Sequence, residues 1–571
     1  MAQYKGKGVS RGVAIGEVLV YRPFSPVLDE RCDYSPALDK ITDFIKALAM
    51  AESEYARMLA PTIGQKNDDA AILAAHVEIL RDPEIYGEIR DLLEKEPISA
   101  ALAVARVFDG FAETLSSLDD ELIRERSTDV IDVRNRILRI LAGLPEQNLS
   151  RLDGPRVIVA RDLMPSDAVI LDRDMTAAIV TEIGGETSHT AIIARGYGIP
   201  ALVGVENVTE ILRDGEEVIV DAIDGALYTE AGEDAVSIFA EKSAEYRRRV
   251  EASRAYIRRD AATTDGVRVE VGVNIQNVSD DLETLADVSD SVGLFRTEFM
   301  FMERSVPPTE DEQCEAYKRV LSAFAGKYVI LRTIDIGGDK DYPAFNLPRE
   351  DNPFLGLRAI RLCLAKQDIF RTQLRAAFRA SVAGNLWIML PMVNGMDDIR
   401  RAKTIIGEVK RELASEGIPF SSDVKTGIMI EVPSIAIIAD IAAEEVDFAS
   451  IGSNDLCQYT LAVDRMNPGV SEYYEPFRPS LFRLMKFAID EFTKRGKPIG
   501  ICGEMGGDPL AAAVLLGLGI RQLSAGPDML PRLKEFICTH SLAEMEECAR
   551  PVLDLPTSAE IKEFLERRMK F

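Results

Sequence analysis

The spacing of hydrophobic residues divides the first part of the chain into two kinds of structure. From about Leu38 to Leu144, hydrophobic residues recur every three or four positions and glycine is sparse, which predicts a helical bundle. On either side, in Gly8–Tyr21 and from Val157 to about Glu230, short runs rich in β-branched residues predict strands. We therefore expect a small α/β domain with an inserted helical domain, at residues 1–30 plus 145–230 and at residues 31–144.

The rest of the chain alternates strand-like and helical stretches. Residues 231–262 are charged, contain no proline and have a helical pattern, which predicts a solvated connecting helix. Residues 263–571 contain eight strand-like runs separated by helical stretches, and this pattern favours a closed (β/α)8 barrel. The runs are Val267–Ile275, Val292–Arg296, Tyr328–Ile336, Leu386–Val393, Gly427–Val432, Phe448–Ile451, Ile499–Cys502 and Leu523–Ala525.

Polar residues gather where the predicted barrel strands end. They are Arg296, Arg332, Asp335, Glu431, Asn454, Asp455, Cys502 and Glu504. Because the active sites of such barrels lie at the C-terminal ends of the strands, we expect these residues to share one rim.

The composition excludes several classes of partner. The 571 residues include 67 Lys and Arg against 94 Asp and Glu, a net charge of −27, so the mean field repels nucleic acid and anionic membrane surfaces. The longest apolar stretch, Ala511–Ile520, is much shorter than the roughly 18 residues that span a bilayer, and the N-terminus lacks a signal-peptide pattern. The seven scattered cysteines include no C-x-x-C pair. We expect a cytoplasmic protein without nucleic-acid partners or membrane insertion.

One of the three histidines, His189, follows a glycine-rich turn. A predicted strand, Ala177–Ile183, leads into two glycines, and Thr187 and Ser188 are natural N-cap residues for a helix that begins there. The free N–H groups of a first helical turn can hold a phosphate, and the helix dipole favours a neutral imidazole, the form that attacks phosphorus. From the residues alone, His189 is either a phosphorylated nucleophile or a structural histidine.

The segment around His189 resembles the phosphohistidine domain of phosphoenolpyruvate-utilising enzymes. The resemblance covers Gly184–Arg195 and continues through Gly198–Gly204. It implies a swivelling domain on which His189 carries a phosphoryl group. It also implies that the phosphohistidine is surrounded by Thr187, Ser188 and Arg195.

The second half of the chain carries, in the expected order, motifs that resemble the phosphoenolpyruvate-binding barrel of the same family. They are Gly293–Phe301, Leu331–Lys340, Gly427–Ser434, Ile451–Leu456, Ala462–Arg465 and Gly500–Glu504. Guanidinium groups suit the phosphate and carboxylate of this substrate. The resemblance implies substrate binding by Arg296, Arg332, Lys340, Arg358, Asn454, Asp455 and Arg465. The alternatives are surface salt bridges for the motif arginines, a strand-end cap for Asn454 and a turn residue for Lys340.

Two further roles concern a metal ion and a proton. Glu431 and Asp455 offer hard oxygen ligands of the kind that Mg²⁺ accepts while it keeps several waters, so we expect Mg²⁺ as the cofactor. When the phosphoryl group leaves, the enolate carbon needs a proton to become pyruvate, and a thiol can supply it. The resemblance implies this role for Cys502. A lone cysteine at a strand end would otherwise be core packing.

The order of segments resembles enzyme I of the phosphoenolpyruvate-dependent sugar phosphotransferase system over essentially the full length. Members of that family pass the phosphoryl group from phosphoenolpyruvate to their own histidine and then to the phosphocarrier HPr, releasing pyruvate. The resemblance implies that HPr docks on the helical insert, that Arg126 faces the phosphohistidine at His189, and that a homodimer forms through the barrel. His76 either takes part in docking or packs inside the bundle. The related dikinases also carry a large ATP-binding domain, for which the chain has no room.

Four positions depart from the common pattern of the family, namely Arg11, Met164, Ala168 and Arg478. None removes a catalytic residue; the features they bear on are the detailed hydrogen bonding around His189 and the choice of carrier. The rival interpretation is a non-catalytic regulator that senses phosphoenolpyruvate by binding alone. Such a sensor would not need Cys502.

Overall fold

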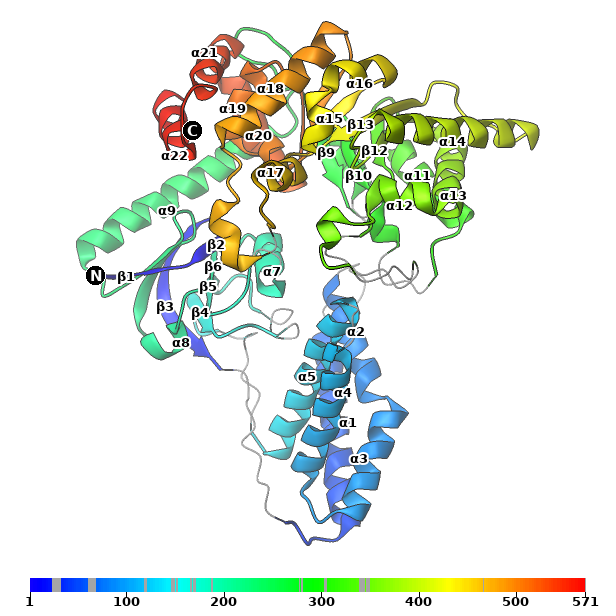
Figure 1. The fold of residues 1–571 in the computed structure, drawn as a ribbon. Coiled ribbons are helices and arrows are strands. Elements are labelled where there is room, and N and C mark those ends of the chain that lie inside the picture. Colours follow the sequence, from blue (N-terminus) through cyan, green and yellow to red (C-terminus); the bar gives the residue numbers. More distant parts are fainter. Residues whose placement is uncertain are drawn as a thin grey trace. The chain divides into compact units, whose positions relative to one another are not determined.

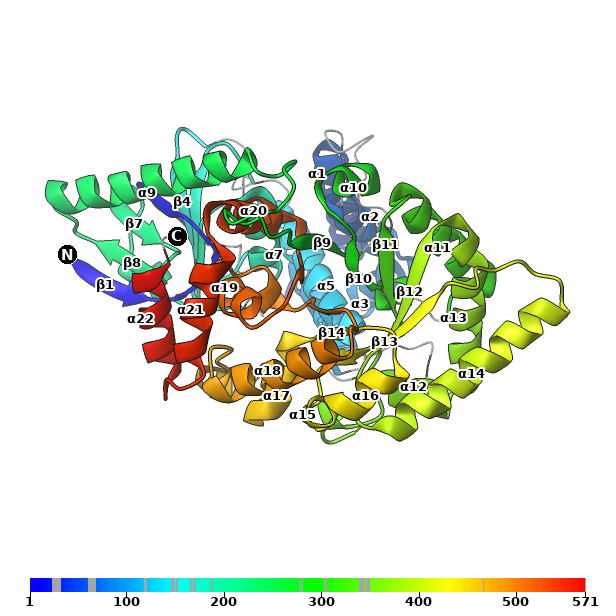
Figure 2. The same ribbon diagram turned by 90° about the horizontal axis from the view of Figure 1, so that it is seen from above.

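The chain forms two compact units, Met1–Arg249 and Val250–Phe571, in a computed structural model (Figures 1 and 2). The structure describes residues 1–22, 32–59, 68–117, 121–144, 149, 152–164, 167, 171–185, 188–276, 278, 281–301, 306–337, 345, 350–465 and 467–569.

The first unit contains an eight-stranded mixed sheet with the strand order β1-β8-β7-β3-β4-β5-β6-β2. Its strands are β1 Ala2–Lys5, β2 Lys7–Ser10, β3 Val13–Tyr21, β4 Arg156–Ala160, β5 Thr176–Thr181, β6 Ala201–Val203, β7 Glu217–Asp221 and β8 Ala226–Thr229. β3 pairs in parallel with β4, from Glu17 opposite Arg156 to Tyr21 opposite Ala160. The chain before the helical stretch and the chain after it therefore belong to one sheet.

Between β3 and β4 the chain forms the expected helices. They are α1 Ala37–Leu59, α2 Asp68–Leu80, α3 Pro83–Lys95, α4 Ala100–Ser117 and α5 Glu121–Leu141. On α1 the buried residues Phe44, Ala47, Ala51 and Tyr55 follow the helical period, so one face enters the core of the bundle. Helix α3 begins where the Asp82 side chain accepts a hydrogen bond from the backbone N–H of Glu84.

Further helices follow in the described part of the first unit and at its end. They are α7 His189–Tyr197, α8 Val208–Ile211 and α9 Glu233–Arg254. The last of these occupies most of the stretch for which a connecting helix was expected. No helix within the described residues has the length and apolar character that crossing a membrane requires.

The second unit is a closed barrel in which every neighbouring pair of strands is parallel, so the predicted barrel is confirmed. Its strands are β9 Glu270–Ile275, β10 Val292–Arg296, β11 Tyr328–Arg332, β12 Asn385–Leu390, β13 Lys425–Ile430, β14 Ala449–Ile451, β15 Ile499–Ile501 and β16 Gln522–Ala525. β11 and β12 end earlier than the hydrophobic pattern predicted. After Arg332 and Leu390 the chain turns out of the sheet into loops that remain buried.

The helices of the second unit pack on the outside of the barrel. They are α10 Leu282–Val288, α11 Glu310–Ala323, α12 Ala359–Ala365, α13 Gln367–Ala380, α14 Met396–Ser415, α15 Pro433–Ile437, α16 Ala439–Glu445, α17 Ser453–Leu461, α18 Pro479–Lys494, α19 Pro509–Gly517, α20 Leu530–Thr539, α21 Leu542–Val552 and α22 Ser558–Arg568. Capping boxes at Thr309 and Ser541 fix the starts of α11 and α21. The outward side chains of the strands and the inner faces of these helices form one large hydrophobic core.

A smaller cluster fills part of the barrel interior. It contains Leu294, Ile330, Trp387, Met389, Met429, Phe448 and Cys502. Tyr328 and Trp387 stack with their ring centroids 4.3 Å apart. Gly293 lies at the same level of the barrel, and a larger residue would not fit there: a Cβ added at Gly293 would lie 2.3 Å from the Cβ of Ser524. The interior is therefore packed without room for extra carbon at this point.

We expect Gly293→Ala to lower the free energy of unfolding of the barrel by about 1–3 kcal/mol, because the new methyl group must displace Ser524. Gly407→Ala is the matched control: it lies inside α14, where an added Cβ would meet only Arg411 Nη1 at an ordinary contact distance of 3.6 Å, so alanine should stabilise by up to about 1 kcal/mol. Trp387, the only tryptophan of the chain, reports on the barrel by its fluorescence during urea unfolding. Equal midpoints for Gly293→Ala and the wild type would contradict the packing described here.

Candidate functional site

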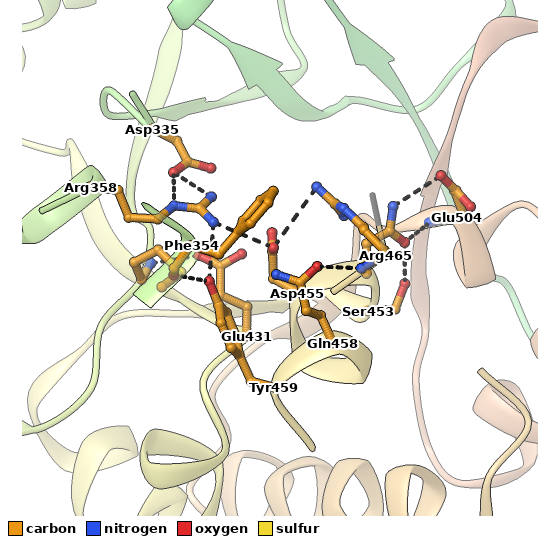
Figure 3. A network of polar contacts seen from close by, with 12 residues as sticks. Asp335, Phe354, Arg358, Glu431, Ser453, Asp455, Gln458, Tyr459, Arg465 and Glu504 are labelled. Atoms are coloured by element: carbon orange, nitrogen blue, oxygen red, sulfur yellow. Dashed lines mark hydrogen bonds and ion pairs between the residues drawn. The ribbon is translucent and has the colours of Figure 1, made fainter. Parts of the chain in front are cut away.

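The C-terminal ends of the barrel strands bring most of the predicted site residues together (Figure 3). Arg296 and Arg332 are the last residues of β10 and β11, and Glu431 directly follows β13. Asn454 and Asp455 lie in the first turn of α17, just after β14, and Cys502 directly follows β15. One rim of the barrel therefore carries cationic, acidic and thiol side chains.

Two arginines of the rim share one carboxylate. Arg332 Nη1 lies 2.9 Å from Asp335 Oδ2, and Arg358 Nη2 lies 2.9 Å from Asp335 Oδ1. The other end of the Arg332 guanidinium forms an ion pair with Glu298. All four side chains are at least nine-tenths buried, so these charges depend on one another rather than on water.

The pKa values follow from this arrangement. Burial alone would raise the pKa of Asp335, but Arg358 and Arg332 outweigh it and lower the pKa to about 2. Burial acts to lower the pKa of Arg332, and Glu298 and Asp335 raise it above its usual range. Asp335 is therefore ionised at neutral pH and holds both guanidinium groups in fixed positions.

A second layer of hydrogen bonds fixes the backbone around Arg332. Gln373, on α13, donates from Nε2 to Thr297 Oγ1 at 2.9 Å and accepts from the Ile334 N–H at 2.9 Å. Thr297 Oγ1 in turn donates to the Arg332 carbonyl at 2.9 Å. These bonds tie the ends of β10 and β11 together, which orients the arginines that terminate them.

Two guanidinium groups retain buried donors. Among the described residues, the Nε atoms of Arg296 and Arg332 have no hydrogen-bond partner. Burial, with the charge of Arg332 beside it, lowers the pKa of Arg296. A buried donor left unpaired is costly, so these nitrogens are suited to an anionic oxygen of a ligand.

Glu431 and Asp455 form an acidic pair at the centre of the rim. Glu431 is 1% exposed and accepts a hydrogen bond from the Met392 N–H at 2.5 Å. Burial, followed by the charges of Asp455 and Asp335, raises the pKa of Glu431 to about 8. Asp455 Oδ1 is 3.7 Å from Arg358 Nη1 and 3.9 Å from Arg465 Nη2 and makes no hydrogen bond within the described residues. Additional positive charge at this place would stabilise both carboxylates.

The acidic pair is not a complete metal site by itself. In the part of the chain that the structure describes, no group of three or more His, Cys, Asp or Glu side chains has the arrangement of a metal centre. Two carboxylates with a free, buried oxygen do suit a hard divalent cation that keeps several waters or substrate oxygens as its other ligands. The residues present therefore fit such an ion.

Cys502 lies at the same rim and is 2% exposed. Its thiol donates to the Ile451 carbonyl at 3.7 Å, and its own carbonyl accepts from Asn274 Nδ2 at 3.1 Å. Burial raises the pKa of the thiol to about 11, although a hydrogen bond from Ser450 and the charge of Arg332 act to lower it. At neutral pH this cysteine is a protonated thiol and not a thiolate nucleophile.

Asn454 forms a reciprocal pair with Glu504. Its Nδ2 donates to Glu504 Oε1 at 3.0 Å, and its Oδ1 accepts from the Glu504 N–H at 3.2 Å. The end of β14 is thereby tied to the segment after β15, which carries Cys502. Where Gly503 lies between them, an added Cβ would come within 1.9 Å of Ser453 Oγ, so only glycine allows this approach.

Three of the non-glycine residues with positive φ border the rim. Met392 (φ 54°) donates to Glu431, Ala359 (φ 51°) follows Arg358, and Ala462 (φ 52°) closes α17 before Arg465. Left-handed backbone costs energy for residues with a Cβ and persists where the surroundings impose it. The rim thus holds its charged side chains on a constrained backbone.

In the first unit, α7 begins at His189 after the turn Gly184–Gly185, as the sequence predicted. Ser188 is its N-cap, with its hydroxyl accepting from the Ala191 N–H at 3.3 Å and donating to the Gly185 carbonyl at 2.9 Å. Gly184 has a φ of 119°, which favours glycine at the turn. The backbone around His189 thus has the strand, turn and helix order from which an N-terminal anion site is built.

Other predicted residues are placed as follows. Arg195 and Arg126 are exposed on α7 and α5. His76 is fully buried, and its Nε2 lies 3.1 Å from Asp129 Oδ1. It therefore presents no surface to a partner, and any contribution to docking passes through Asp129. The side chain of His189, together with Thr187, Lys340 and Ala168, lies outside the part that the structure describes.

The sequence did not single out several residues that the site uses. Glu298 and Tyr459 pair with Arg332 and Arg358, the latter through a 3.1 Å hydrogen bond. Asn274 was hidden inside a hydrophobic run. A polar residue at an inward position of a buried strand was the signal that could have revealed Asn274.

Known families match almost the entire chain. The model described as "PEP-utilising enzyme, N-terminal" matches residues 5–126, "PEP-utilising enzyme, mobile domain" matches 152–225, and "PEP-utilising enzyme, PEP-binding domain" matches 250–541. These matches cover most of the bundle, the segment with His189 and the strands of the barrel in the order that the motifs predicted.

Curated relatives match over the full length. A protein of Priestia megaterium named phosphoenolpyruvate-protein phosphotransferase is 41% identical over 565 residues, which cover 99% of this chain and 98% of that protein. Proteins of the same name from Staphylococcus aureus and Bacillus subtilis (strain 168) are 41% and 40% identical, over 99% and 100% of both chains. The chain therefore belongs to the phosphoenolpyruvate-utilising enzymes, in the family of the phosphoenolpyruvate-protein phosphotransferases.

Proposed function

We propose that the protein transfers the phosphoryl group of phosphoenolpyruvate to its own His189 and then to a histidine of the phosphocarrier HPr, releasing pyruvate. This is the first step of the sugar phosphotransferase system. The observation that carries the proposal is the barrel rim itself, where buried guanidinium donors, an acidic pair and a protonated thiol converge. Phosphoenolpyruvate would use all three kinds of group, because it carries a phosphate and a carboxylate and its enolate must be protonated on carbon.

The arginines bind and orient the substrate. The unpaired Nε donors of Arg296 and Arg332 are directed to anionic oxygens, and Arg358 and Arg465 lie on either side of Asp455. Asn454 and Lys340 complete the set of proposed contacts. Because Asp335 and Glu298 hold the guanidinium groups in place before the substrate arrives, little reorganisation is needed when charge moves during transfer.

Glu431 and Asp455 are the residues that would hold Mg²⁺. When bound, the ion would neutralise charge that develops on the phosphoryl oxygens. Glu431 must lose its proton to serve as a ligand, since its pKa is raised to about 8. We therefore propose that loading of the metal and deprotonation of Glu431 are coupled.

Cys502 is the proposed acid that converts the enolate into pyruvate. Its raised pKa of about 11 keeps the thiol protonated, as an acid requires, and its burial keeps the proton at a fixed place on the rim. Protonation at carbon removes the enolate and makes the phosphoryl transfer hard to reverse.

The first unit supplies the acceptor and the carrier site. We propose residues 1–30 plus 145–230 as the phosphohistidine domain, residues 31–144 as the HPr-docking domain and 231–262 as the linker to a barrel of 263–571. Thr187, Ser188, Arg195 and Arg126 are the proposed environment of the phosphohistidine, and both arginines are exposed as such a role requires. We also propose that the enzyme acts in the cytoplasm as a homodimer formed through the barrel.

His189→Ala should bind phosphoenolpyruvate and magnesium but form no phosphoprotein, because the rim residues belong to the other unit. Incubation with phosphoenolpyruvate labelled at phosphorus, followed by detection of acid-labile phosphate, measures this directly. His540→Ala is the control and should label normally, since its ring bonds within its own helix region to the Phe536 carbonyl. Normal labelling of His189→Ala would contradict the nucleophile assignment.

Glu431→Gln should raise the magnesium concentration needed for half-maximal labelling by at least about tenfold. In the wild type, this concentration should fall as the pH rises from 6 to 8 and level off above that, because the Glu431 pKa of about 8 makes a proton compete with the metal. In the metal-free folded chain the pKa of Glu431 is raised from 4.5 to about 8, so the folded state binds this proton more tightly than the unfolded state does. The free energy of unfolding of the metal-free chain should therefore fall as the pH rises from 6 to 8.

The surface variant Glu445→Gln, which loses only an exposed pair with Arg400, is the control for these titrations. Magnesium curves that are identical for Glu431→Gln and the control would place the ligands elsewhere.

Cys502→Ala should slow pyruvate formation by about 10²–10⁴-fold while leaving labelling of His189 in a single turnover. Protonation of a methyl-bearing substrate analogue should lose its stereoselectivity, because solvent reaches the free enol from both faces. Cys548→Ala, which removes another buried thiol on α21, controls for general destabilisation. If Cys502→Ala turns over normally and stays stereoselective, the acid is another group, with Glu504 the next candidate.

A further inference from the structure

The barrel interior contains a small polar cavity below the rim. Its space open to a water molecule is about 10 Å³, close to what one water occupies. The polar side chains in its lining are Glu270, Ser291, Tyr328, Ser450, Gln522 and Ser524. Glycines 293 and 500 also line it. A polar cavity of this size suits one water with several hydrogen-bond partners.

The end of the cavity that is remote from the rim carries an unsatisfied acid. Glu270, Tyr328 and Gln522 are the first residues of β9, β11 and β16, so they lie at the N-terminal end of the barrel, and all three are partly exposed. Glu270 Oε2 accepts from Gln522 Nε2 at 3.1 Å, whereas Oε1 is buried and has no partner in the described part of the chain. A water in the cavity would satisfy this oxygen.

The other end of the cavity reaches Cys502 through Ser450. Ser450 lies in the middle of β14, paired with Gly500 of β15, and is 3% exposed. Ser450 lines the cavity and precedes Ile451, whose carbonyl accepts the hydrogen bond of the Cys502 thiol at 3.7 Å. Ser450 also acts to lower the pKa of that thiol, so it lies close to both the thiol at the rim and the polar space beneath it.

We propose that Ser450, a water in this cavity and Glu270 form a proton path through the inside of the barrel that restores the proton on Cys502. The proposal rests on the proposed function, because it assumes that Cys502 is the acid. A path from below is needed since the thiol is buried and the reaction product lies above it on the rim.

Every proton that moves along the proposed path comes from a named group. The enolate electron pair takes the thiol proton, so the S–H bond breaks, a C–H bond forms at the methylene carbon, and the C=O bond of pyruvate is restored. The thiolate takes the Ser450 proton, Ser450 takes one from the cavity water, and the water is reprotonated by a solvent proton that enters by way of the Glu270 carboxylate. Each turnover consumes one solvent proton, and no other reactant is needed.

The test uses the full chain with Mg²⁺ and pyruvate in D₂O, with loss of the pyruvate methyl proton signal as the readout. Exchange requires the Cys502 thiolate to remove a methyl proton and the resulting thiol to trade that proton with solvent. We expect Ser450→Ala to slow exchange by about tenfold, because the removed proton returns to the same carbon before it escapes. Single-turnover phosphorylation of His189 from phosphoenolpyruvate should stay within about twofold of wild type, since that step needs no proton from Cys502.

Three further variants make the result specific. Ser450→Thr keeps the hydroxyl and should recover most of the exchange. Glu270→Gln should slow exchange in the same direction as Ser450→Ala. Ser524→Ala removes a hydroxyl from the same cavity that is committed to the Ile501 carbonyl at 3.2 Å, so it should exchange like wild type.

The outcomes test the proton path and the identity of the acid separately. Exchange that persists in Cys502→Ala overturns the assignment of the acid and with it the proposed function of that residue. Exchange lost in Cys502→Ala but normal in Ser450→Ala leaves the acid in place and overturns the path. Equal losses in Ser450→Ala and Ser524→Ala would trace the effect to packing and also overturn it.

Discussion

The rim of the barrel depends on one carboxylate shared by two buried arginines. Asp335 holds both Arg332 and Arg358, and without it two positive charges would remain in a region from which water is excluded. Removing one partner of a buried charged network leaves an uncompensated charge, which costs several kcal/mol. Arg332 can therefore keep an unpaired Nε donor for a substrate only because Asp335 and Glu298 satisfy the remaining part of its guanidinium group.

This charge balance also explains why neighbouring acids behave differently. Asp335 lies between arginines and stays ionised, whereas burial and two nearby carboxylates favour protonation of Glu431. Cys502 is kept protonated mainly by burial. Environment thus gives each group a different protonation state at one pH, and that difference separates charge binding, metal binding and proton donation on a single rim.

Much of this arrangement follows from the sequence, because a parallel barrel places the ends of all its strands on one rim. The eight strand-like runs and the polar residues at their ends were sufficient to predict the closed barrel and to gather Arg296, Arg332, Glu431, Asp455 and Cys502. The pairing of charges was not predictable in this way. Which carboxylate meets Arg332 depends on loop paths after the strands, and there the hydrophobic period carries no information.

The cavity beneath Cys502 could not be predicted from the sequence either. Glu270, Ser450 and Gly500 are far apart in sequence, and each alone would be an ordinary residue of a strand. Only the barrel register places Ser450 beside Gly500 and opens polar space next to the thiol. The close approach of Ser524 accounts for Gly293, but a fully apolar interior would pack more easily than one lined by hydroxyls and a glutamate. Supplying protons to a buried acid is a reason to keep these polar groups.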